Sequence, residues 1–124
     1  MYWDNLVPFE TLVGKTLQSC TEDIYEVTFR VSDDESYKLY HSQDCCESVY
    51  IESIDGDLSD LVGTPILMAE EVSNEEDPGP LGEYEDSYTW TFYKLATVKG
   101  YVTIRFYGSS NGYYSERVDF VKIC

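Results

Sequence analysis

The residues with the most obvious chemistry lie in one short segment, Tyr-His-Ser-Gln-Asp-Cys-Cys-Glu at positions 40–47. The segment contains an imidazole, a carboxylate and two adjacent thiols, which are ligand types that Zn²⁺ prefers. Two thiolates and an imidazole suit a tetrahedral d¹⁰ ion. The sequence therefore predicts a metal site made of His41, Asp44, Cys45 and Cys46.

Two features leave the predicted zinc site open. The spacing matches no standard zinc pattern, and the fourth ligand is Asp44, Cys20 or Cys124. Adjacent side chains in extended backbone point to opposite faces, so Cys45 and Cys46 share a metal only if the chain turns there. The alternative is that one of these cysteines is buried as a small apolar residue while His41 is hydrogen-bonded beneath a sheet.

The same segment also permits a thiol enzyme, because a cysteine nucleophile needs a histidine base. Asp44 and Glu47 oppose this interpretation, since nearby carboxylates raise the pKa of a thiol. The sequence has no glycine-rich phosphate loop, no Gly-x-Ser-x-Gly elbow and no His-Glu-x-x-His motif. We therefore expect a protein that is not an enzyme.

Charge is divided unevenly along the chain. Residues 1–86 have a formal charge of -19 and residues 87–124 have +3, which gives the net -16. Such a polyanion is repelled by nucleic acid and by anionic membranes, but it is attracted to the Lys- and Arg-lined channels of nucleic-acid-binding proteins. The predicted partner is therefore such a protein, with no direct binding of nucleic acid or membrane. The alternative is an ordinary, well-solvated acidic domain.

Composition predicts one soluble, folded domain over residues 1–124. Hydrophobic residues make up 43% of the chain and aromatic residues 15%, which is too apolar for a disordered acidic tail. There is no basic leader and no run of apolar residues long enough to span a membrane, so we expect a cytoplasmic protein, most simply a monomer. Cys45 and Cys46 are adjacent, and reduced thiols are expected.

Alternation of polar residues with β-branched and aromatic residues predicts a mainly β (α+β) domain. We expect an antiparallel twisted sheet or a sandwich with one or two short helices. The helical turns are expected at residues 8–13 and 57–63, the second with Asp57 as its N-cap. The predicted strands are residues 16–21, 24–32, 36–42, 47–54, 65–72, 87–98, 101–109 and 113–122.

The last three predicted strands should form a meander, because Asn111-Gly112 is a favoured hairpin turn. Their expected core residues are Trp90, Phe92, Val102, Ile104, Phe106, Val118 and Phe120. Arg105 and Arg117 are expected to pair with acids of the rest of the domain. Before the meander, residues 73–86 form a long acidic loop with prolines and glycines, which is a predicted binding element.

Several segments resemble a family of small, mostly uncharacterised phage and prophage proteins. They are His-Ser-Gln-Asp-Cys-Cys-Glu-Ser-Val (41–49), Asp-Gly-Asp-Leu-Ser-Asp-Leu-Val-Gly-Thr-Pro-Ile-Leu (55–67), Ala-Glu-Glu-Val-Ser-Asn (69–74), Ser-Tyr-Thr-Trp-Thr-Phe-Tyr-Lys (87–94) and Gly-Tyr-Val-Thr-Ile-Arg (100–105). Within that family the chain resembles the anti-CRISPR proteins of the type II-A class. The resemblance implies metal-assisted structure and inhibition of the RNA-guided DNA nuclease by binding.

Charge and resemblance together predict an inhibitor that blocks the loading of target DNA, because the nuclease holds its heteroduplex in a basic channel. A structural zinc ion would then position the acidic loops. The predicted contact residues are Glu70, Glu71, Glu75, Glu76, Asp77, Glu83, Glu85 and Asp86. Two other functions are possible from the sequence: a small enzyme with an open metal site, and a sponge for a signalling nucleotide. The sponge requires Arg105, Arg117, Lys94 and Lys99 to gather in one pocket.

Overall fold

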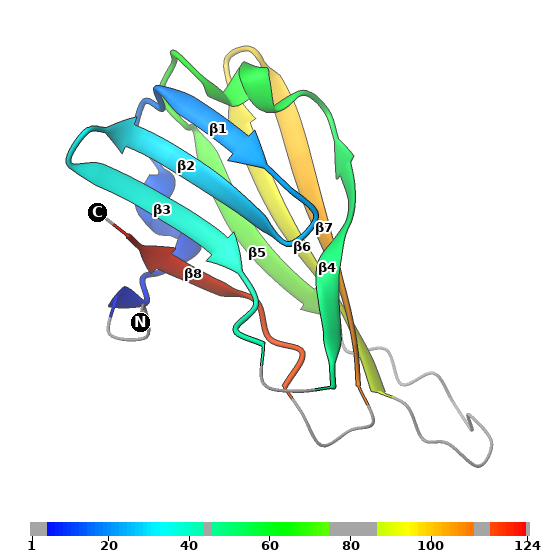
Figure 1. Cartoon of the computed structure of the whole chain (residues 1–124). Coiled ribbons are helices and arrows are strands. Elements are labelled where there is room, and N and C mark those ends of the chain that lie inside the picture. The colour runs from blue at the N-terminus through cyan, green and yellow to red at the C-terminus, as the bar shows by residue number, and fades with distance from the viewer. Residues whose placement is uncertain (1–4, 44–45, 75–86, 111–114, 124) are drawn as a thin grey trace.

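Two four-stranded antiparallel sheets face each other across one hydrophobic core (Figure 1). This computed structural model describes residues 5–43, 46–74, 87–110 and 115–123. The first sheet has the order β1 (Ser19–Glu22), β2 (Glu26–Ser32), β3 (Glu35–Tyr40), β8 (Asp119–Lys122). The second has the order β4 (Ser48–Asp55), β7 (Gly100–Ser110), β6 (Ser87–Thr97), β5 (Met68–Asn74). The mainly β prediction is confirmed, and of the two expected arrangements the sandwich is the one found.

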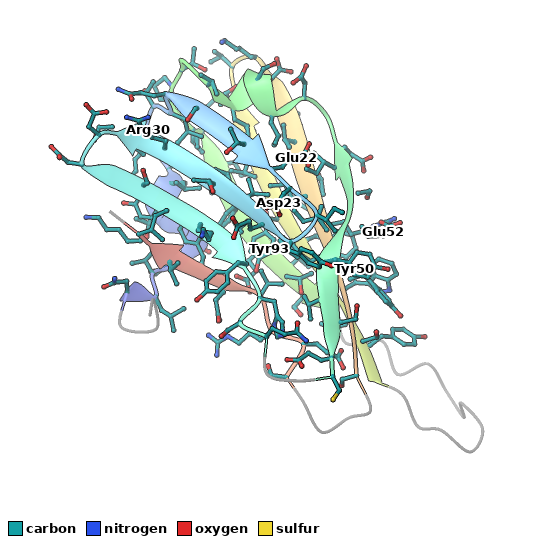
Figure 2. The ribbon with its side chains drawn as sticks, viewed as in Figure 1. Glu22, Asp23, Arg30, Tyr50, Glu52 and Tyr93 are labelled. Carbon is teal, nitrogen blue, oxygen red and sulfur yellow. The ribbon has the colours of Figure 1, made fainter. Side chains whose placement is uncertain are left out.

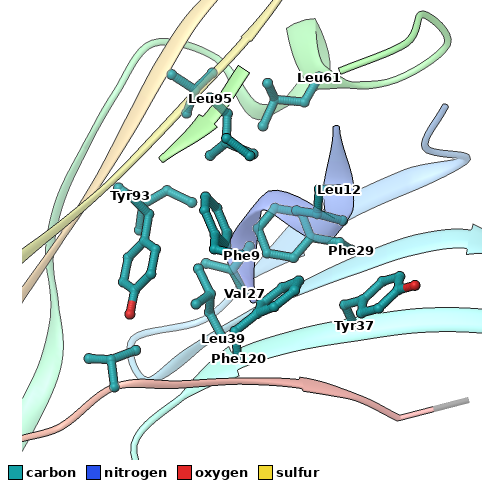
Figure 3. Close-up of a cluster of buried hydrophobic side chains, with 14 of the residues drawn as sticks. Phe9, Leu12, Val27, Phe29, Tyr37, Leu39, Leu61, Tyr93, Leu95 and Phe120 are labelled. Carbon is teal, nitrogen blue, oxygen red and sulfur yellow. The ribbon is translucent and has the colours of Figure 1, made fainter. Parts of the chain in front are cut away.

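The core forms where the inward faces of the two sheets meet. Alternation with period two places Val27, Phe29 and Leu39 of the first sheet against the inward residues of the second, and all are fully buried. The 3₁₀ turn η2 (Phe9–Leu12) adds a ring between the sheets. The Phe9 ring lies 4.9 Å from Tyr93 and 5.1 Å from Phe120 between centroids (Figure 3). Phe9 thus contacts both sheets at once.

Both predicted helical turns are present, as short 3₁₀ turns. The second, η3 (Leu58–Leu61), begins after Asp57, whose side chain accepts a 3.0 Å hydrogen bond from the Ser59 amide. This confirms Asp57 as the N-cap, because its oxygen satisfies an amide that has no partner inside the turn. Within the described residues, no helix is long and apolar enough to cross a membrane.

The predicted meander is wrong in its third strand. The β6 and β7 strands pair as expected, but β8 is shorter than predicted and pairs with β3 in the other sheet, where Phe120 lies opposite Leu39. The reason lies in residues 115–118, which are not a strand and which bring a buried Glu116 onto the inner side of β6 and β7.

Glu116 is held there by two hydroxyl groups. Its Oε1 accepts a 2.8 Å bond from Thr89 and its Oε2 a 2.6 Å bond from Ser110. Gly108 leaves the necessary space, because a Cβ at that position would lie 2.9 Å from the Glu116 Cβ. Residues 115–118 thus lead the chain from the second sheet to the first, and β4 pairs along the edge of β7 where the third strand of the meander was expected.

Two of the predicted core residues are also misplaced. Trp90 and Phe92 are only partly buried, while Thr91, Tyr93 and Leu95 of the same strand are buried. Aromatic residues occur on both faces of β6, so alternation alone left its orientation undecided. The other five predicted core residues are buried.

Candidate functional site

A buried pair, His41 and Glu47, joins the end of β3 to the start of β4. The His41 Nε2 lies 2.8 Å from the Glu47 Oε2, and the two side chains are 4% and 0% exposed. The other ring nitrogen, Nδ1, lies 2.5 Å from the Arg117 carbonyl oxygen. Three segments distant in sequence therefore meet at one imidazole.

The protonation of His41 follows from its partners. A backbone carbonyl only accepts hydrogen bonds, so Nδ1 carries a proton and donates it to Arg117. Nε2 then either donates to an ionised Glu47, which makes a buried ion pair, or accepts from a protonated Glu47, which makes a neutral pair. In both cases both ring nitrogens are occupied, and neither has a lone pair available for a metal.

Gln43 completes the pair. Its Nε2 donates to the backbone oxygen of Glu47 at 2.6 Å and to the Glu47 Oε1 at 3.2 Å. Both carboxylate oxygens of Glu47 are thus hydrogen-bonded, which is what a buried carboxyl group requires. The arrangement is typical of a structural bond between segments.

A surface cavity of about 470 Å³ lies beside this pair. Besides the three residues above, its wall contains Tyr25, Ser48 and Val49. Catalysis by a hydroxyl would require a base within hydrogen-bonding reach of it, and His41 is already held by Glu47 and Arg117. In the part of the chain that the structure describes, no nucleophile is hydrogen-bonded to this histidine.

The predicted zinc ligands do not form a metal site as far as the structure describes them. Asp44 and Cys45 lie outside the described residues. Cys46 is disulfide-bonded, which differs from the expected reduced state, and Cys20 is a free thiol. Among the described residues, no group of three or more His, Cys, Asp and Glu side chains is arranged to hold a metal. The disulfide sulfur of Cys46 and the engaged nitrogens of His41 do not fit a zinc site in this form, and zinc stays a prediction.

A second cavity, of about 410 Å³, opens between β5 and β8. Glu10, Glu71, Arg117 and Asp119 line it with apolar residues, and Arg117 pairs with Asp119 at 3.2 Å. Burial raises the pKa of Glu71 above its ordinary value, partly offset by Arg117, and burial likewise raises the pKa of Asp119. The fold thus places the Glu71 and Asp119 carboxyl groups where burial destabilises their ionised forms.

The buried Tyr93 hydroxyl is directed toward β8 (Figure 3). It has no partner in the described part of the chain that meets the limits of a hydrogen bond, although Glu71 is near enough to influence its pKa. Burial is the main cause that raises the pKa of Tyr93. The hydroxyl therefore remains protonated and neutral.

Exposed acids follow both edges of the second sheet. On the β4 edge, Glu22 at the end of β1 and Asp23 in the β1–β2 connection lie with Glu52 around a shallow cavity (Figure 2). On the opposite edge, Glu70 of β5 is exposed and lies opposite Lys94 in register. Glu22, Asp55 and Glu70 have no ion-pair partner within 4.0 Å in the described ranges. These acids, Glu22, Asp23, Glu52, Asp55 and Glu70, are called the edge acids below.

The predicted contact residues divide into three groups. Glu70 points outward, whereas its neighbour Glu71 points to the inner side and lines the second cavity. The two therefore do not share a face as predicted. The remaining six, Glu75, Glu76, Asp77, Glu83, Glu85 and Asp86, lie outside the described residues.

Sequence reasoning missed the buried acids Glu47 and Glu116. Both stand in polar segments beside hydroxyl, amide or imidazole residues, and no periodic pattern marks them as internal. Arg105 pairs with Glu52 of β4, as expected of an acid from the rest of the domain. Arg117 pairs instead with Asp119, two residues further along its own segment.

Fold and site together define a small acidic β-sandwich whose clearest buried polar cluster is structural. Residues 10–120 match a domain of unknown function, DUF7448, and the chain belongs to that family. No curated protein and no solved structure matches the chain.

Removing the imidazole tests the structural role of the buried pair. We expect His41→Ala to lower the free energy of unfolding by about 3 kcal/mol, because it leaves a buried carboxyl without its partner. Arg30→Ala is the control, since Arg30 and Asp33 form an exposed pair that contributes below about 1 kcal/mol. Urea unfolding measures both, and equal losses would contradict the assignment.

Removing the charge of Glu71 should stabilise the fold. A carboxyl group whose pKa is raised by folding opposes folding once it ionises, so its unfavourable effect grows as pH rises from the ordinary carboxyl pKa through the raised one. Glu71→Gln should therefore gain stability at about pH 7, by less than about 1 kcal/mol because solvent screens the group. The gain should shrink toward about pH 5. A gain independent of pH, measured by urea unfolding, would exclude this cause.

Zinc binding is expected to depend on the redox state. The disulfide form should bind no zinc, and a chelator should leave its Tm unchanged, because neither His41 nor Cys46 offers a free donor. Native mass spectrometry and thermal melts with and without reductant measure this. Equimolar zinc in the reduced form, lost in Cys46→Ser, would support the predicted site for that form, whereas zinc retained in the disulfide form would contradict the expectation.

Proposed function

We propose that this protein is a non-catalytic binding protein whose acidic surface occupies the basic, nucleic-acid-binding surface of a partner protein. The observation that supports this most directly is the exposure of the edge acids on a chain of net charge -16. Self-repulsion of this size costs stability, so the charge calls for an explanation beyond solubility.

The sandwich gives these charges a fixed spacing. Edge acids of β4 and β5 stand on two sides of one sheet, whose strands are held by a continuous backbone ladder. Carboxylates fixed in this way can pair with lysines and arginines that otherwise hold phosphates. The acidic segment 75–86 follows β5 directly in sequence and contributes six further carboxylates to the charge of the chain.

The particular partner that we propose is a type II-A CRISPR RNA-guided nuclease, on the sequence resemblance to anti-CRISPR proteins. Such a nuclease binds its target through a basic channel and recognises the heteroduplex by its backbone. An acidic sandwich in that channel would block target loading by charge and by volume. The host-cell cytoplasm is then the place of action, and no covalent step is needed.

The two alternatives have less support. An enzyme would need a free base or an open metal site, and the described histidine is fully hydrogen-bonded. A sponge for an anionic nucleotide would need gathered cations. Arg105 and Arg117 are paired with acids, and the Lys99 Nζ donates to the Val62 carbonyl at 2.7 Å.

The proposal is tested by DNA binding and DNA cleavage with a guide-loaded type II-A nuclease, at low and high salt. We expect the protein to inhibit both at low salt and less at high salt, because exposed charges are screened. Glu70→Lys and Glu22→Lys should slow association roughly several-fold, as rim charges mainly affect the on-rate.

Asp34→Lys provides the matched control, with the same change of charge in the β2–β3 turn of the first sheet, at the end of β2 opposite to Glu22. It should have a smaller effect than the two edge variants. Inhibition that is insensitive to salt and equal in all three variants would contradict an electrostatic contact at the edges. No inhibition of several nucleases of the class would exclude the proposed partner.

A further inference from the structure

The outer face of the second sheet carries a group of aromatic side chains that the core does not use. We call Tyr50, Tyr88, Trp90, Phe92 and Tyr107 the aromatic platform. All five are partly buried and lie on the side opposite to the buried residues of their strands. Val72 of β5 extends the apolar surface and is 38% exposed.

Strand register makes the platform continuous. Tyr107 of β7 lies opposite Tyr50 of β4 on one side and opposite Trp90 of β6 on the other. The Tyr107 ring is 5.8 Å from Tyr50, 4.6 Å from Trp90 and 6.2 Å from Tyr88 between centroids. Neighbouring rings on a rigid sheet lose little conformational freedom on binding, which favours them in interfaces.

Contact of such an apolar surface with water is energetically unfavourable. Sheet faces that meet water normally carry polar residues, so a contiguous group of partly exposed aromatic rings on such a face favours a binding site. Trp and Tyr are also the residue types enriched among those that contribute most to protein interfaces. The rings offer both an apolar face and, in tyrosine, a hydroxyl that burial in the cluster keeps protonated, since it raises the pKa of Tyr107.

Arg105 shows within the molecule how the platform binds a cation. Its guanidinium carbon lies 4.9 Å from the Trp90 ring centroid, and its Nε donates to the Glu52 Oε2 at 2.6 Å. An aromatic face and a carboxylate thus hold one guanidinium between them. Glu52 and Asp55 border the platform on β4, and Glu70 borders the outer face on β5.

The charge around the platform favours a basic protein over a nucleic acid as the partner. Arg105 is neutralised by Glu52, and the edge acids give the rim a negative potential, so phosphates of a nucleic acid are repelled. A basic protein surface is attracted by the same rim. Its arginines can stack on the remaining rings, as Arg105 does on Trp90.

We propose that the aromatic platform is the apolar centre of an interface for an arginine-rich protein surface, with the edge acids as its rim. The inference rests on the proposed function in that both require a basic protein partner. It adds where the centre of the contact lies and which side chains supply its affinity.

The test uses the full chain with two probes, the guide-loaded nuclease and a deca-arginine peptide, and measures association and dissociation rates. Tyr107→Ser and Tyr50→Ser should each weaken binding roughly tenfold or more, mainly through faster dissociation. Tyr101→Ser is the matched control: Tyr101 lies on the same strand and the same face, is 75% exposed and pairs with Ala96 outside the platform. It should change binding by no more than roughly twofold.

Unchanged binding of both platform variants, with thermal melts like that of the original chain, would overturn the inference. A second measurement does not depend on those variants: in Trp3→Phe the only tryptophan is Trp90, whose fluorescence should change when deca-arginine binds. A constant signal during binding would overturn the inference as well, as would preference for a single-stranded oligonucleotide over the peptide.

The outcomes separate this inference from the proposed function. Binding of the peptide through the platform without binding of any nuclease would support the platform and exclude the nuclease as partner. Inhibition of the nuclease that is lost in the Glu70→Lys and Glu22→Lys variants but kept in Tyr107→Ser would support the acidic contact and overturn the platform.

Discussion

The sandwich depends on how residues 115–118 pass from the second sheet to the first. Two buried carboxyl groups hold this crossing: Glu116 accepts hydrogen bonds from Thr89 and Ser110, and Glu47 holds the imidazole that is bonded to the Arg117 carbonyl. Beyond the crossing, β8 pairs with β3, and Phe120 enters the core beside Phe9. A buried carboxyl is costly unless its oxygens are hydrogen-bonded, so these partners specify the path strongly.

The strongly acidic composition is compatible with a stable fold because buried and exposed carboxyl groups have different surroundings. The two carboxyl groups buried at the crossing have hydroxyl, amide or imidazole partners, while acids such as Glu22, Asp55 and Glu70 remain in water. Screening by salt reduces the repulsion among these exposed charges but does not abolish it. The core itself is made of aliphatic and aromatic side chains from both sheets and adds no charge.

Much of the fold could be predicted from local pattern, and the parts that could not are long-range. Alternation located the strands, and Asp57 marked its turn, because both signals depend on neighbours in sequence. The destination of β8 depended on Glu116 finding space above Gly108 and donors on β6 and β7, which no local pattern records. The prediction of which face of β6 is buried was wrong for a related reason. Trp90 and Tyr93 lie on opposite faces, and which one enters the core depends on how the whole strand pairs with β7 and packs on the other sheet.

At the candidate site, too, the sequence indicated the residue types, whereas their hydrogen-bond partners come from distant segments. Ligand types at 41–47 indicated metal chemistry, but His41 acts as a donor to one segment and a partner to another, which leaves it neither free base nor free ligand. A histidine that holds a fold together and a histidine that binds a metal have the same identity and differ only in what occupies their two nitrogens. The surface that we propose for binding lies away from this histidine, on the outer face of the second sheet. There, large rings such as Trp90 and Tyr107 lie outside the hydrophobic core. The proposal of a binding protein therefore rests on two observations: both nitrogens of the buried imidazole are engaged, and partly exposed aromatic rings gather on one outer sheet face.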